Sequence, residues 1–424
     1  MGGDKMADGP GLAARRAALR LLDAVLRRGL PLEAALDAAA RELTRGDDRA
    51  LAHALAAAVL RRLPDLDALI DSATARPLPA DAKARFALRI ALAQALVLGT
   101  PGHAAIATVL PLVDGGPRKL VHGVFGTLMR RRVALPARPS LPGGVAQRWL
   151  AAWGRDMIDA AAEAIAAPAP IDLSFAVEPE AFDGVALAPR HRRLPPGTRV
   201  TELPGYAEGG WWVQDLAASI PARLLGAGGG RQALDLCAAP GGKTLQLAAA
   251  GWRVTALDNA PARLDRLRDN LARTGLPAEL VLADVLDWAP PAPVDAILLD
   301  APCSATGIFR RHPDVLHRVR AKDIAALAEL QGRLLARAAG WLRPGGILVF
   351  ATCSLEPQEG EAHLAAAEAA GLEPVPVLAD ELPPGILPDP RGHVRTLPSI
   401  LADQGRLDGF FIARFRRAGQ AGAD

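Results

Sequence analysis

Hydrophobic positions along the chain change their spacing, and each change marks a different kind of structure. From residue 12 to about 132 they recur with the 3.6-residue period of amphipathic helices. In Leu12–Arg28, for example, Leu22 and Val25 share one face and Arg16 and Arg20 fall on the opposite one. This part of the chain is therefore predicted to contain helices only.

Further helices are expected at Asp47–Leu63 and Ala80–Leu98, with Pro64 and Gly99 marking their ends. The short turns between them predict a compact helical bundle, and we assign it residues 12–134.

A segment rich in proline and glycine, Leu135–Gly144, separates this bundle from the rest of the chain. Val145–Ala166 has a helical pattern, and after it short apolar pieces alternate with turn residues and a basic run, Arg190–Arg193. We assign residues 145–225 to a small domain that mixes helix and strand.

From residue 231 onward, short apolar strands alternate with helical stretches. This alternation is typical of a doubly wound parallel sheet, and no internal repeat accompanies it. We place this third domain at residues 226–418. The strands are expected at Ala233–Cys237, Val254–Asp258, Leu280–Asp284, Ala296–Asp300 and Ile347–Thr352.

Length and composition limit the number of domains and the kinds of partner that can be inferred. The 424 residues exceed a typical domain, and 50% of them are hydrophobic, enough for several cores. A formal charge of +3 says little about partners, so any nucleic-acid site must rest on local arginine clusters. Residues 1–11 are expected to be disordered, and nothing in the sequence suggests an obligate dimer, so a monomer is expected.

The three cysteines are too few and too scattered for a disulfide framework, and they form no zinc motif. No histidine has metal-ligand spacing, so no metal is expected. No apolar run approaches the length of a membrane span, and no signal-peptide core is present. A soluble cytoplasmic protein is therefore expected.

The ends of the predicted strands carry the residues of a candidate cofactor site, because ligands of open α/β sheets bind beyond those ends. The first strand runs into Cys237-Ala-Ala-Pro-Gly-Gly-Lys-Thr244, where Gly241 and Gly242 allow a tight turn and a close approach to a ligand. Asp258, about 16 residues later, suits ribose hydroxyls, and Asp284 suits an adenine amino group. This arrangement fits an adenosyl cofactor.

A P-loop is the alternative interpretation of the same segment. Gly242-Lys243-Thr244 satisfies the end of that pattern, and Ala296–Asp300 could serve as its acidic strand. The pattern needs a glycine where Cys237 stands, however, and a nucleotide triphosphatase leaves Asp258 and Asp284 without a role.

Two further cysteines follow the fourth and fifth strands. Asp300-Ala-Pro-Cys303-Ser and Thr352-Cys353-Ser each place a thiol at the edge where the cofactor is expected. A cysteine in such a place is usually only a small buried residue, and we take Cys237 to be one. Two of them at one functional edge instead indicate nucleophilic chemistry, and the residues alone leave open which thiol attacks.

The sequence resembles the Sun/nucleolar-protein family of RNA cytosine-5 methyltransferases, and within it the bacterial subgroup that acts on 16S ribosomal RNA. The matching strings are DLCAAPGGKT (235–244), LLDAPCSATGIFRRHPDV (298–315), LRPGGILVFATCSLEPQEGE (342–361) and DGFFIARF (408–415). Upstream, residues 88–106 resemble the NusB-like module of that subgroup. The resemblance implies a NusB-like all-α bundle that binds RNA, a small α+β RNA-binding domain, and a Rossmann-like class I methyltransferase domain.

The resemblance also implies S-adenosyl-L-methionine as cofactor and roles for individual residues. Cys353 becomes the nucleophile and Cys303 the cysteine that assists release. The chemistry of thiol addition itself calls for a carboxyl, such as Asp300, that contacts ring nitrogen 3. Addition of a thiolate to carbon 6 makes carbon 5 of cytosine nucleophilic enough to take a methyl group, which explains the need for a thiol. The implied cofactor residues are Cys237, Ala238, Ala239, Pro240, Gly241, Gly242, Lys243, Asp258, Asp284 and Asp300.

Two departures from the family pattern stand out. Leu173–Ala176 occupies the place of an Arg-Val-Asn-like strand, and Gly360 replaces a more usual asparagine or acid.

RNA contacts are expected from two groups of basic residues. Arg310, Arg311 and His312 follow the Pro-Cys strand, and Arg130 and Arg131 end a helix of the bundle. For the first group the alternative, which we favour less, is a solvated loop. For the arginines at the helix end, a favourable contact with the helix dipole is an equally good explanation. A transfer-RNA substrate and a non-catalytic RNA-binding or antitermination factor remain alternatives, although the intact cysteines argue against the latter.

Overall fold

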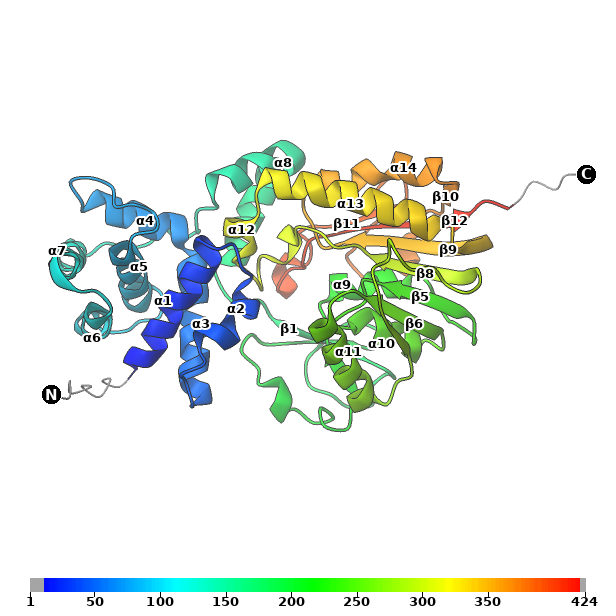
Figure 1. The fold of residues 1–424 in the computed structure, drawn as a ribbon, viewed down its shortest axis with the longest axis horizontal. Coiled ribbons are helices and arrows are strands. Elements are labelled where there is room, and N and C mark those ends of the chain that lie inside the picture. The colour runs from blue at the N-terminus through cyan, green and yellow to red at the C-terminus, as the bar shows by residue number, and fades with distance from the viewer. Residues whose placement is uncertain (1–10, 420–424) are drawn as a thin grey trace, which may run out of the picture. The chain divides into compact units, whose positions relative to one another are not determined.

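The computed structural model describes residues 11–419, and contacts between residues divide the chain into two compact units (Figure 1). Among the described residues, one unit is helical and comprises residues 11–147, 161–167 and 311–319. The other contains the two β-sheets of the described chain and comprises residues 148–160, 168–310 and 320–419. The three-part division at 134, 145 and 225 stays a prediction. Of the segment expected to be disordered, residues 1–10 lie outside the described part, and Gly11 caps the first helix.

The helical unit is built from amphipathic helices around one hydrophobic core, as the periodicity predicts. Leu21, Leu22 and Val25 of the first helix are fully buried in this core. The hydrophobic pattern did not predict the short helices α2, α4 and α6 as separate elements. The helices are α1 (Leu12–Leu26), α2 (Leu32–Ala39), α3 (Gly46–Arg61), α4 (Leu63–Ser72), α5 (Lys83–Leu96), α6 (Gly102–Val109) and α7 (Gly115–Arg130).

A distant segment, residues 311–319 with helix α12 (Val315–Arg318), completes the helical unit. Asp314 accepts a hydrogen bond from the backbone N–H of Leu32 at 3.4 Å, and His317 Nε2 donates to the carbonyl of Leu60 at 2.7 Å. These contacts bring together residues more than 200 positions apart, which no local pattern could indicate.

The chain continues through α8 (Gly143–Ile165), which bends at Gly154, into a four-stranded antiparallel sheet. The strand order is β2-β3-β1-β4. Part of the basic run is internal, because Arg193 is only 4% exposed and its guanidinium binds both oxygens of buried Asp172 at 2.7 Å. The strands are β1 (Ile171–Phe175), β2 (Val185–Ala188), β3 (His191–Leu194) and β4 (Trp211–Val213).

A mixed eight-stranded sheet dominates this unit, in the order β10-β12-β9-β8-β5-β6-β7, with β11 paired to β12. The five strands predicted from the sequence form its parallel part, with the first of them at the centre. The parallel strands are β5 (Gln232–Leu236), β6 (Arg253–Asp258), β7 (Glu279–Leu282), β8 (Val294–Asp300) and β9 (Leu342–Thr352).

Three antiparallel strands at one edge were missed by the parallel prediction. Two of them, β10 and β11, are only three residues long and are too short to show a hydrophobic period. The third, β12, pairs with β9. They are β10 (Leu372–Pro374), β11 (Val394–Thr396) and β12 (Phe410–Arg417).

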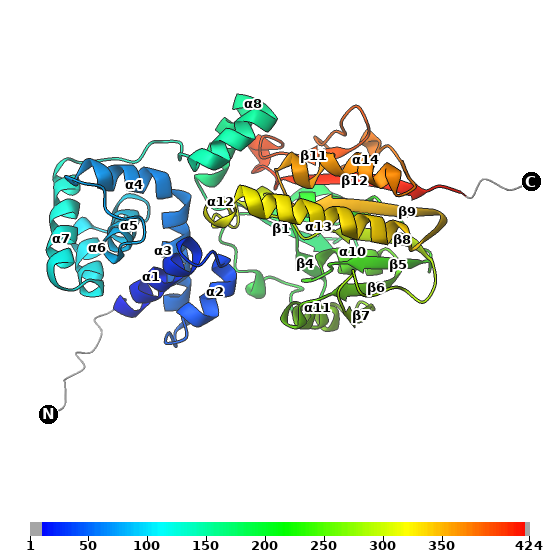
Figure 2. The ribbon, with the colours of Figure 1, turned by 45° about the horizontal axis from the view of Figure 1, so that its top comes forward.

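Helices cover both faces of the large sheet because successive side chains of each strand point to opposite faces. Leu298 of β8 packs with helices α9 to α11, whereas its neighbour Leu299 packs with α13 and α14. Figures 1 and 2 show α13 running over β8 and β9. The helices are α9 (Leu216–Arg223), α10 (Gly242–Ala249), α11 (Pro261–Thr274), α13 (Ala321–Ala339) and α14 (Leu364–Ala369).

Candidate functional site

The loop after the central strand β5 has the tight geometry that its glycines predict. The backbone of Cys237 is left-handed, with φ 61°, and Gly241 has φ 106° directly before α10 begins. A Cβ atom on Gly241 would lie 2.1 Å from Cδ1 of Leu267, so both the turn and the close packing require glycine.

Asp258, at the end of β6, holds this loop in place. Its carboxylate accepts hydrogen bonds from the backbone N–H groups of Ala239 at 3.1 Å and Ala260 at 3.0 Å. Arg263 of α11 adds an ion pair at 2.6 Å. Although Asp258 is only 1% exposed, it lines a cavity at the sheet edge, and a carboxylate has about four acceptor positions.

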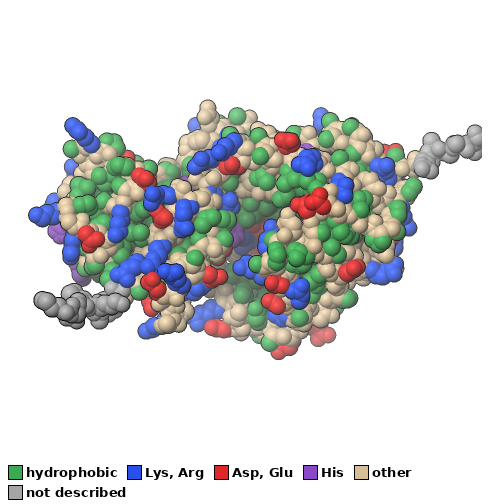
Figure 3. Space-filling view, in the orientation of Figure 1, with side chains coloured by type: hydrophobic (Ala, Val, Ile, Leu, Met, Phe, Trp, Pro, Cys, Tyr) green, Lys and Arg blue, Asp and Glu red, His purple; other side chains and the backbone are tan. Residues whose placement is uncertain are grey.

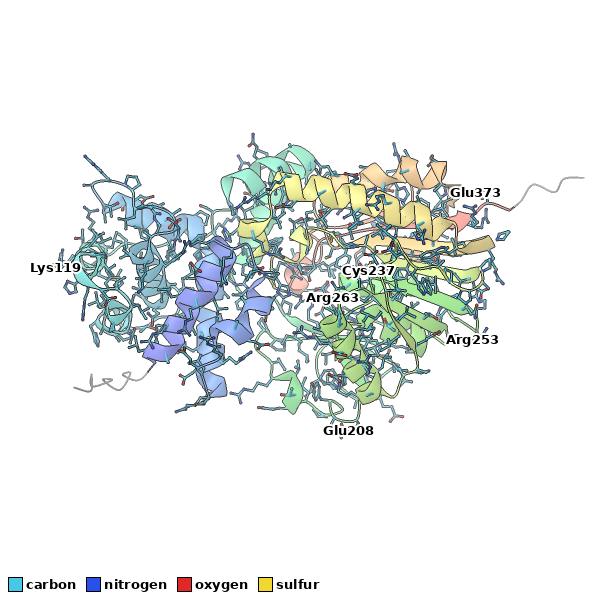
Figure 4. The ribbon with its side chains drawn as sticks, viewed as in Figure 1. Lys119, Glu208, Cys237, Arg253, Arg263 and Glu373 are labelled. Carbon is cyan, nitrogen blue, oxygen red and sulfur yellow. The ribbon has the colours of Figure 1, made fainter. Side chains whose placement is uncertain are left out.

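The cavity has a volume of about 340 Å³ and lies beyond the carboxyl ends of the parallel strands, within one unit. Figure 4 labels two of the residues that line it, Cys237 after β5 and Arg263 on α11. Seven of the residues singled out from the sequence line it: Cys237, Ala239, Asp258, Asp284, Asp300, Cys303 and Cys353. Lining residues that the sequence did not indicate are Asn259, Arg263, Ala283, Val285, Ala301, Pro302, Ala305, Leu330 and Leu334.

The remaining residues of the predicted cofactor set shape the loop without lining the cavity. These are Ala238, Pro240, Gly241, Gly242 and Lys243. Ala238 donates its N–H to the carbonyl of Leu257 at 3.0 Å, which ties the loop to β6.

Lys243 points its ammonium group at the cavity wall rather than at open space. Its Nζ lies 2.7 Å from Oδ2 of Asp300, the last residue of β8. Burial is the largest single influence on the pKa of Lys243 and would lower it, but Asp300, with smaller effects of Cys353 and Asp235, raises the pKa overall. Lys243 and Asp300 are therefore a charged pair at the edge of the cavity.

Asp284 lies two residues beyond the end of β7 and is exposed. Its Oδ1 accepts from the backbone N–H of Leu286 at 2.8 Å, which orients the carboxylate at the cavity.

The two cysteines meet because their strands are parallel neighbours. Asp300 of β8 pairs with Ala351 of β9, and the Sγ atoms of Cys303 and Cys353 lie 3.4 Å apart. The hydrogen bond with Cys353, together with burial, raises the pKa of Cys303 well above its usual range. The third thiol, Cys237, has its pKa raised to about 12, first by burial and then by Asp300 and Asp258. Two partly exposed thiols thus share one wall of the cavity with a carboxylate–ammonium pair.

The structure corrects one expected RNA contact. Arg310 is only 1% exposed, and its guanidinium binds Asp408 at 2.9 Å and Asp215 at 3.1 Å. A side chain enclosed in this way cannot reach a phosphate on the surface, so the role expected for Arg310 was wrong. The sequence could not show this because both partners lie about 100 residues away.

The other residues of the expected RNA set belong to the helical unit. Arg311 and His312 are half-buried there, whereas Arg130 and Arg131 are exposed near the end of α7. Figure 3 shows lysine and arginine side chains scattered over this unit among acidic ones. An RNA contact at these four residues stays a prediction.

Two features are absent from residues 11–419. No group of three or more potential metal-ligating side chains occurs among them. None of the helices in this range combines the length and the hydropathy that a membrane span requires.

Two family models match the chain. The model of the 16S rRNA methyltransferases RsmB/F matches residues 222–416, which include the cavity, and the NusB family model matches residues 12–126. The NusB match confirms the NusB-like bundle expected from the resemblance.

Three curated relatives carry the name ribosomal RNA small subunit methyltransferase B. The protein of Xanthomonas campestris is 36% identical and is aligned over 84% of this chain and 87% of its own length. The proteins of Xylella fastidiosa and Pseudomonas putida are each 36% identical over 94% of this chain, and the alignments cover 98% and 97% of the relatives, respectively.

Solved structures agree with the fold. The crystal structure of PH0851 aligns with a TM-score of 0.74 at 20% identity, over 96% of this chain and 99% of that one. A methyltransferase homologue from Pyrococcus horikoshii aligns with a TM-score of 0.53 at 28% identity, over 69% of this chain and 98% of its own.

Proposed function

This chain belongs to the RsmB/F family of 16S rRNA methyltransferases, and from that premise we propose that it methylates carbon 5 of a cytosine in 16S rRNA through a covalent bond to Cys353. Membership makes it an S-adenosylmethionine-dependent rRNA methyltransferase. The observation that carries the finer proposal is the pair of thiols 3.4 Å apart on the wall of the candidate cofactor cavity.

The cavity suits S-adenosylmethionine in size and in chemistry. A volume of about 340 Å³ falls in the range of small-molecule sites, and carboxylates line it at the ends of β6 and β8. Asp258 retains acceptor capacity for ribose hydroxyls, and Asp284 for an adenine amino group. When bound, S-adenosylmethionine supplies an electrophilic methyl group.

Cys353 is assigned the attack on carbon 6 of the ring. Its sulfur forms a bond to carbon 6, and the ring electrons move towards carbon 5, which then takes the methyl group. The target base must leave any stack to reach a thiol in such a cavity. The assignment of Cys353 rather than Cys303 rests on the family resemblance.

Asp300 and Lys243 are placed to support that attack. Negative charge builds up on the pyrimidine ring during addition, and a proton delivered to ring nitrogen 3 neutralises it, after which the Asp300 carboxylate can accept a hydrogen bond from that N–H. Asp300 lines the same cavity as both thiols, and the Lys243 ammonium beside it at 2.7 Å is a nearby proton source.

Cys303 is assigned to release. The proton on carbon 5 leaves to a base, the bond between carbon 6 and sulfur breaks, and its electron pair returns to the sulfur of Cys353. Because the raised pKa keeps Cys303 as a neutral thiol, its S–H can donate a hydrogen bond to that departing thiolate.

A trapping assay with Cys303→Ala and Cys353→Ala tests the proposal. Each variant and the parent enzyme are incubated with 16S rRNA and S-adenosylmethionine and run on a denaturing gel, beside a tRNA control. A covalent protein–RNA band in Cys303→Ala alone supports attack by Cys353 and release by Cys303, and a band in Cys353→Ala alone exchanges the roles.

The remaining outcomes of the assay decide between the alternatives. A covalent band only with the tRNA would show that tRNA, rather than 16S rRNA, is the substrate. No band and no methylation by the parent would favour the non-catalytic RNA-binding factor. The nucleotide triphosphatase is already excluded by family membership.

A further inference from the structure

One buried carboxylate joins the two loops that carry the cysteines. Glu359 is fully buried, and its Oε1 accepts from the backbone N–H of Ser304 at 2.8 Å. Its Oε2 accepts from the hydroxyl of Ser354 at 2.6 Å and from the hydroxyl of Ser304. Ser304 directly follows Cys303, and Ser354 directly follows Cys353. Both residues after the thiols are therefore bonded to the same group.

The residues before the thiols belong to the same network. Gln331 of α13 donates its amide both to Oε1 of Glu359 at 3.1 Å and to the carbonyl of Pro302 at 2.9 Å. The hydroxyl of Thr352 donates to the backbone carbonyl of Glu359 at 2.8 Å. Pro302 precedes Cys303 and Thr352 precedes Cys353, so Glu359 is connected to the chain on both sides of both thiols.

A carboxylate is the group that this position needs. Four hydrogen bonds from protein donors reach its two oxygens, which matches the acceptor capacity of an ionised carboxylate. Hydrogen bonds to a charged acceptor are short and about twice as strong as neutral ones. An amide that keeps its oxygen against the two N–H groups would place its NH2 group against the hydroxyls of Ser304 and Ser354, which would lose their charged acceptor and would have to turn to accept instead.

We propose that Glu359 is the positioning residue of the two-cysteine site, whose carboxylate sets the separation between the sulfur atoms of Cys303 and Cys353. This inference rests on the proposed function, in which one thiol attacks and its neighbour assists release. Glu359 acts on the sulfur atoms through Ser304 and Ser354, rather than as an acid or a base. Its charge also helps to raise the pKa of Cys303, behind the larger effects of Cys353 and burial.

The chain offers a matched control. Glu356 is 1% exposed and lies three residues away, but its carboxylate accepts from Arg148 at 3.0 Å and Trp149 at 3.1 Å of α8. Glu356→Gln therefore removes a buried charge of the same kind without disturbing the bonds to Ser304 and Ser354.

The first readout is the binding of phenylarsine oxide, which bridges two thiols held close together. It is measured in a Cys237→Ala background, where Cys303 and Cys353 are the remaining cysteines. Glu359→Gln should weaken binding about tenfold, equivalent to about 1.4 kcal/mol, whereas Glu356→Gln should keep the affinity of its parent. Glu359→Asp, which restores a carboxylate, should recover part of the loss.

The second readout is the covalent RNA band. In a Cys303→Ala background, Glu359→Gln should slow formation of the band about tenfold, and Glu356→Gln should not. If Cys303→Ala alone gives no band, the proposed function fails, and the arsenical binding still decides the role of Glu359.

Unchanged arsenical affinity in Glu359→Gln, or an equal loss in Glu356→Gln, would overturn the proposal. Melting temperatures of the two variants show whether folding is affected to the same degree. If Glu359→Gln does not fold, the double variant Ser304→Ala, Ser354→Ala removes only the two hydroxyl groups and decides the question by the same two measurements.

Discussion

The sulfur atoms of Cys303 and Cys353 lie 3.4 Å apart, although the residues are separated by 50 positions in the chain. The pairing of β8 with β9, which are parallel and end at the same edge of the sheet, brings the two loops that carry them together. Thiols this close affect one another's protonation, and the hydrogen bond between them is the largest influence on the pKa of Cys303. Chemical reactivity at the site is therefore a property of the pair.

Replacing Cys353 by alanine should lower the pKa of Cys303, because the hydrogen bond that raises it most is lost. Thiolate is the reactive form, so alkylation of Cys303 by iodoacetamide at pH 8 should become several-fold faster, with its pH midpoint shifted to lower pH. The rate is followed by mass spectrometry of the peptide that contains Cys303. Cys353→Ser, which keeps a hydrogen-bonding group, should shift the midpoint less, and an unchanged midpoint in the alanine variant would contradict the coupling.

Asp235, fully buried beneath the cofactor loop, should make stability depend on pH. Burial is the main cause that raises its pKa from 3.8 to about 7, and its Oδ1 has no hydrogen-bond partner. Between about pH 4 and pH 7 the folded state keeps a proton that the unfolded state releases. The contribution of Asp235 to stability is thus complete below pH 4 and is lost as the pH rises through 7, by on the order of 4 kcal/mol.

Asp235→Asn should remove this dependence. In urea unfolding at pH 5 and pH 8, the midpoint of the variant should fall less with pH than that of the parent. Asp269→Asn, at an exposed position, serves as the control. Equal slopes for Asp235→Asn and the parent would show that Asp235 does not hold the proton.

Arg310→Met should reduce stability rather than RNA binding. The guanidinium lies between Asp215 and Asp408, which are 7% and 2% exposed, and its loss leaves two buried carboxylates without their shared counter-charge. We expect a loss of about 3–5 kcal/mol in unfolding experiments, with the RNA affinity of the folded protein unchanged. Arg268→Met, at an exposed ion pair, should cost less than about 1 kcal/mol. Weaker RNA binding at unchanged stability would show that Arg310 contacts an RNA phosphate, as the sequence predicted.

Gly360→Asn, which introduces the residue more usual in the family, should destabilise this chain. A Cβ atom there would lie 2.6 Å from Nη2 of Arg395 and 2.8 Å from Phe411. Arg395 needs that space, because it binds Glu361 and the carbonyl of Ser354. We expect a cost of about 1–3 kcal/mol, measured by thermal or urea unfolding.

The double variant Gly360→Asn, Arg395→Ala tests the reason for that cost. Removing the guanidinium frees the crowded space, so the double variant should be more stable than the sum of the two single changes predicts. Additive effects would show that the cost of Gly360→Asn does not arise from crowding against Arg395.

Much of this architecture could be predicted from local patterns. The 3.6-residue period of Leu12–Arg28 gives a helix of the bundle, and the apolar runs that end at Asp258 and Asp300 give parallel strands. Because parallel strands end at one edge, the same patterns bring Asp258, Asp300 and both thiols to one cavity. These features depend on neighbours in the chain, which a sequence displays directly.

Contacts between distant residues needed the tertiary structure. Arg310 looks like a surface cation in its local sequence, and only the folding of residues 215 and 408 around it makes it internal. Glu359 likewise reads as one of several acids in a polar segment, yet the pairing of β8 and β9 places Ser304 and Ser354 on its two oxygens.

The sequence by itself therefore determined which residues gather at the edge of the sheet. The tertiary structure decided how far apart the two thiols stand, which charges are buried, and which carboxylate holds the loops. The physical reason is that a period or a strand end is fixed by local geometry, whereas hydrogen bonds and burial depend on side chains that come together only when the chain has folded.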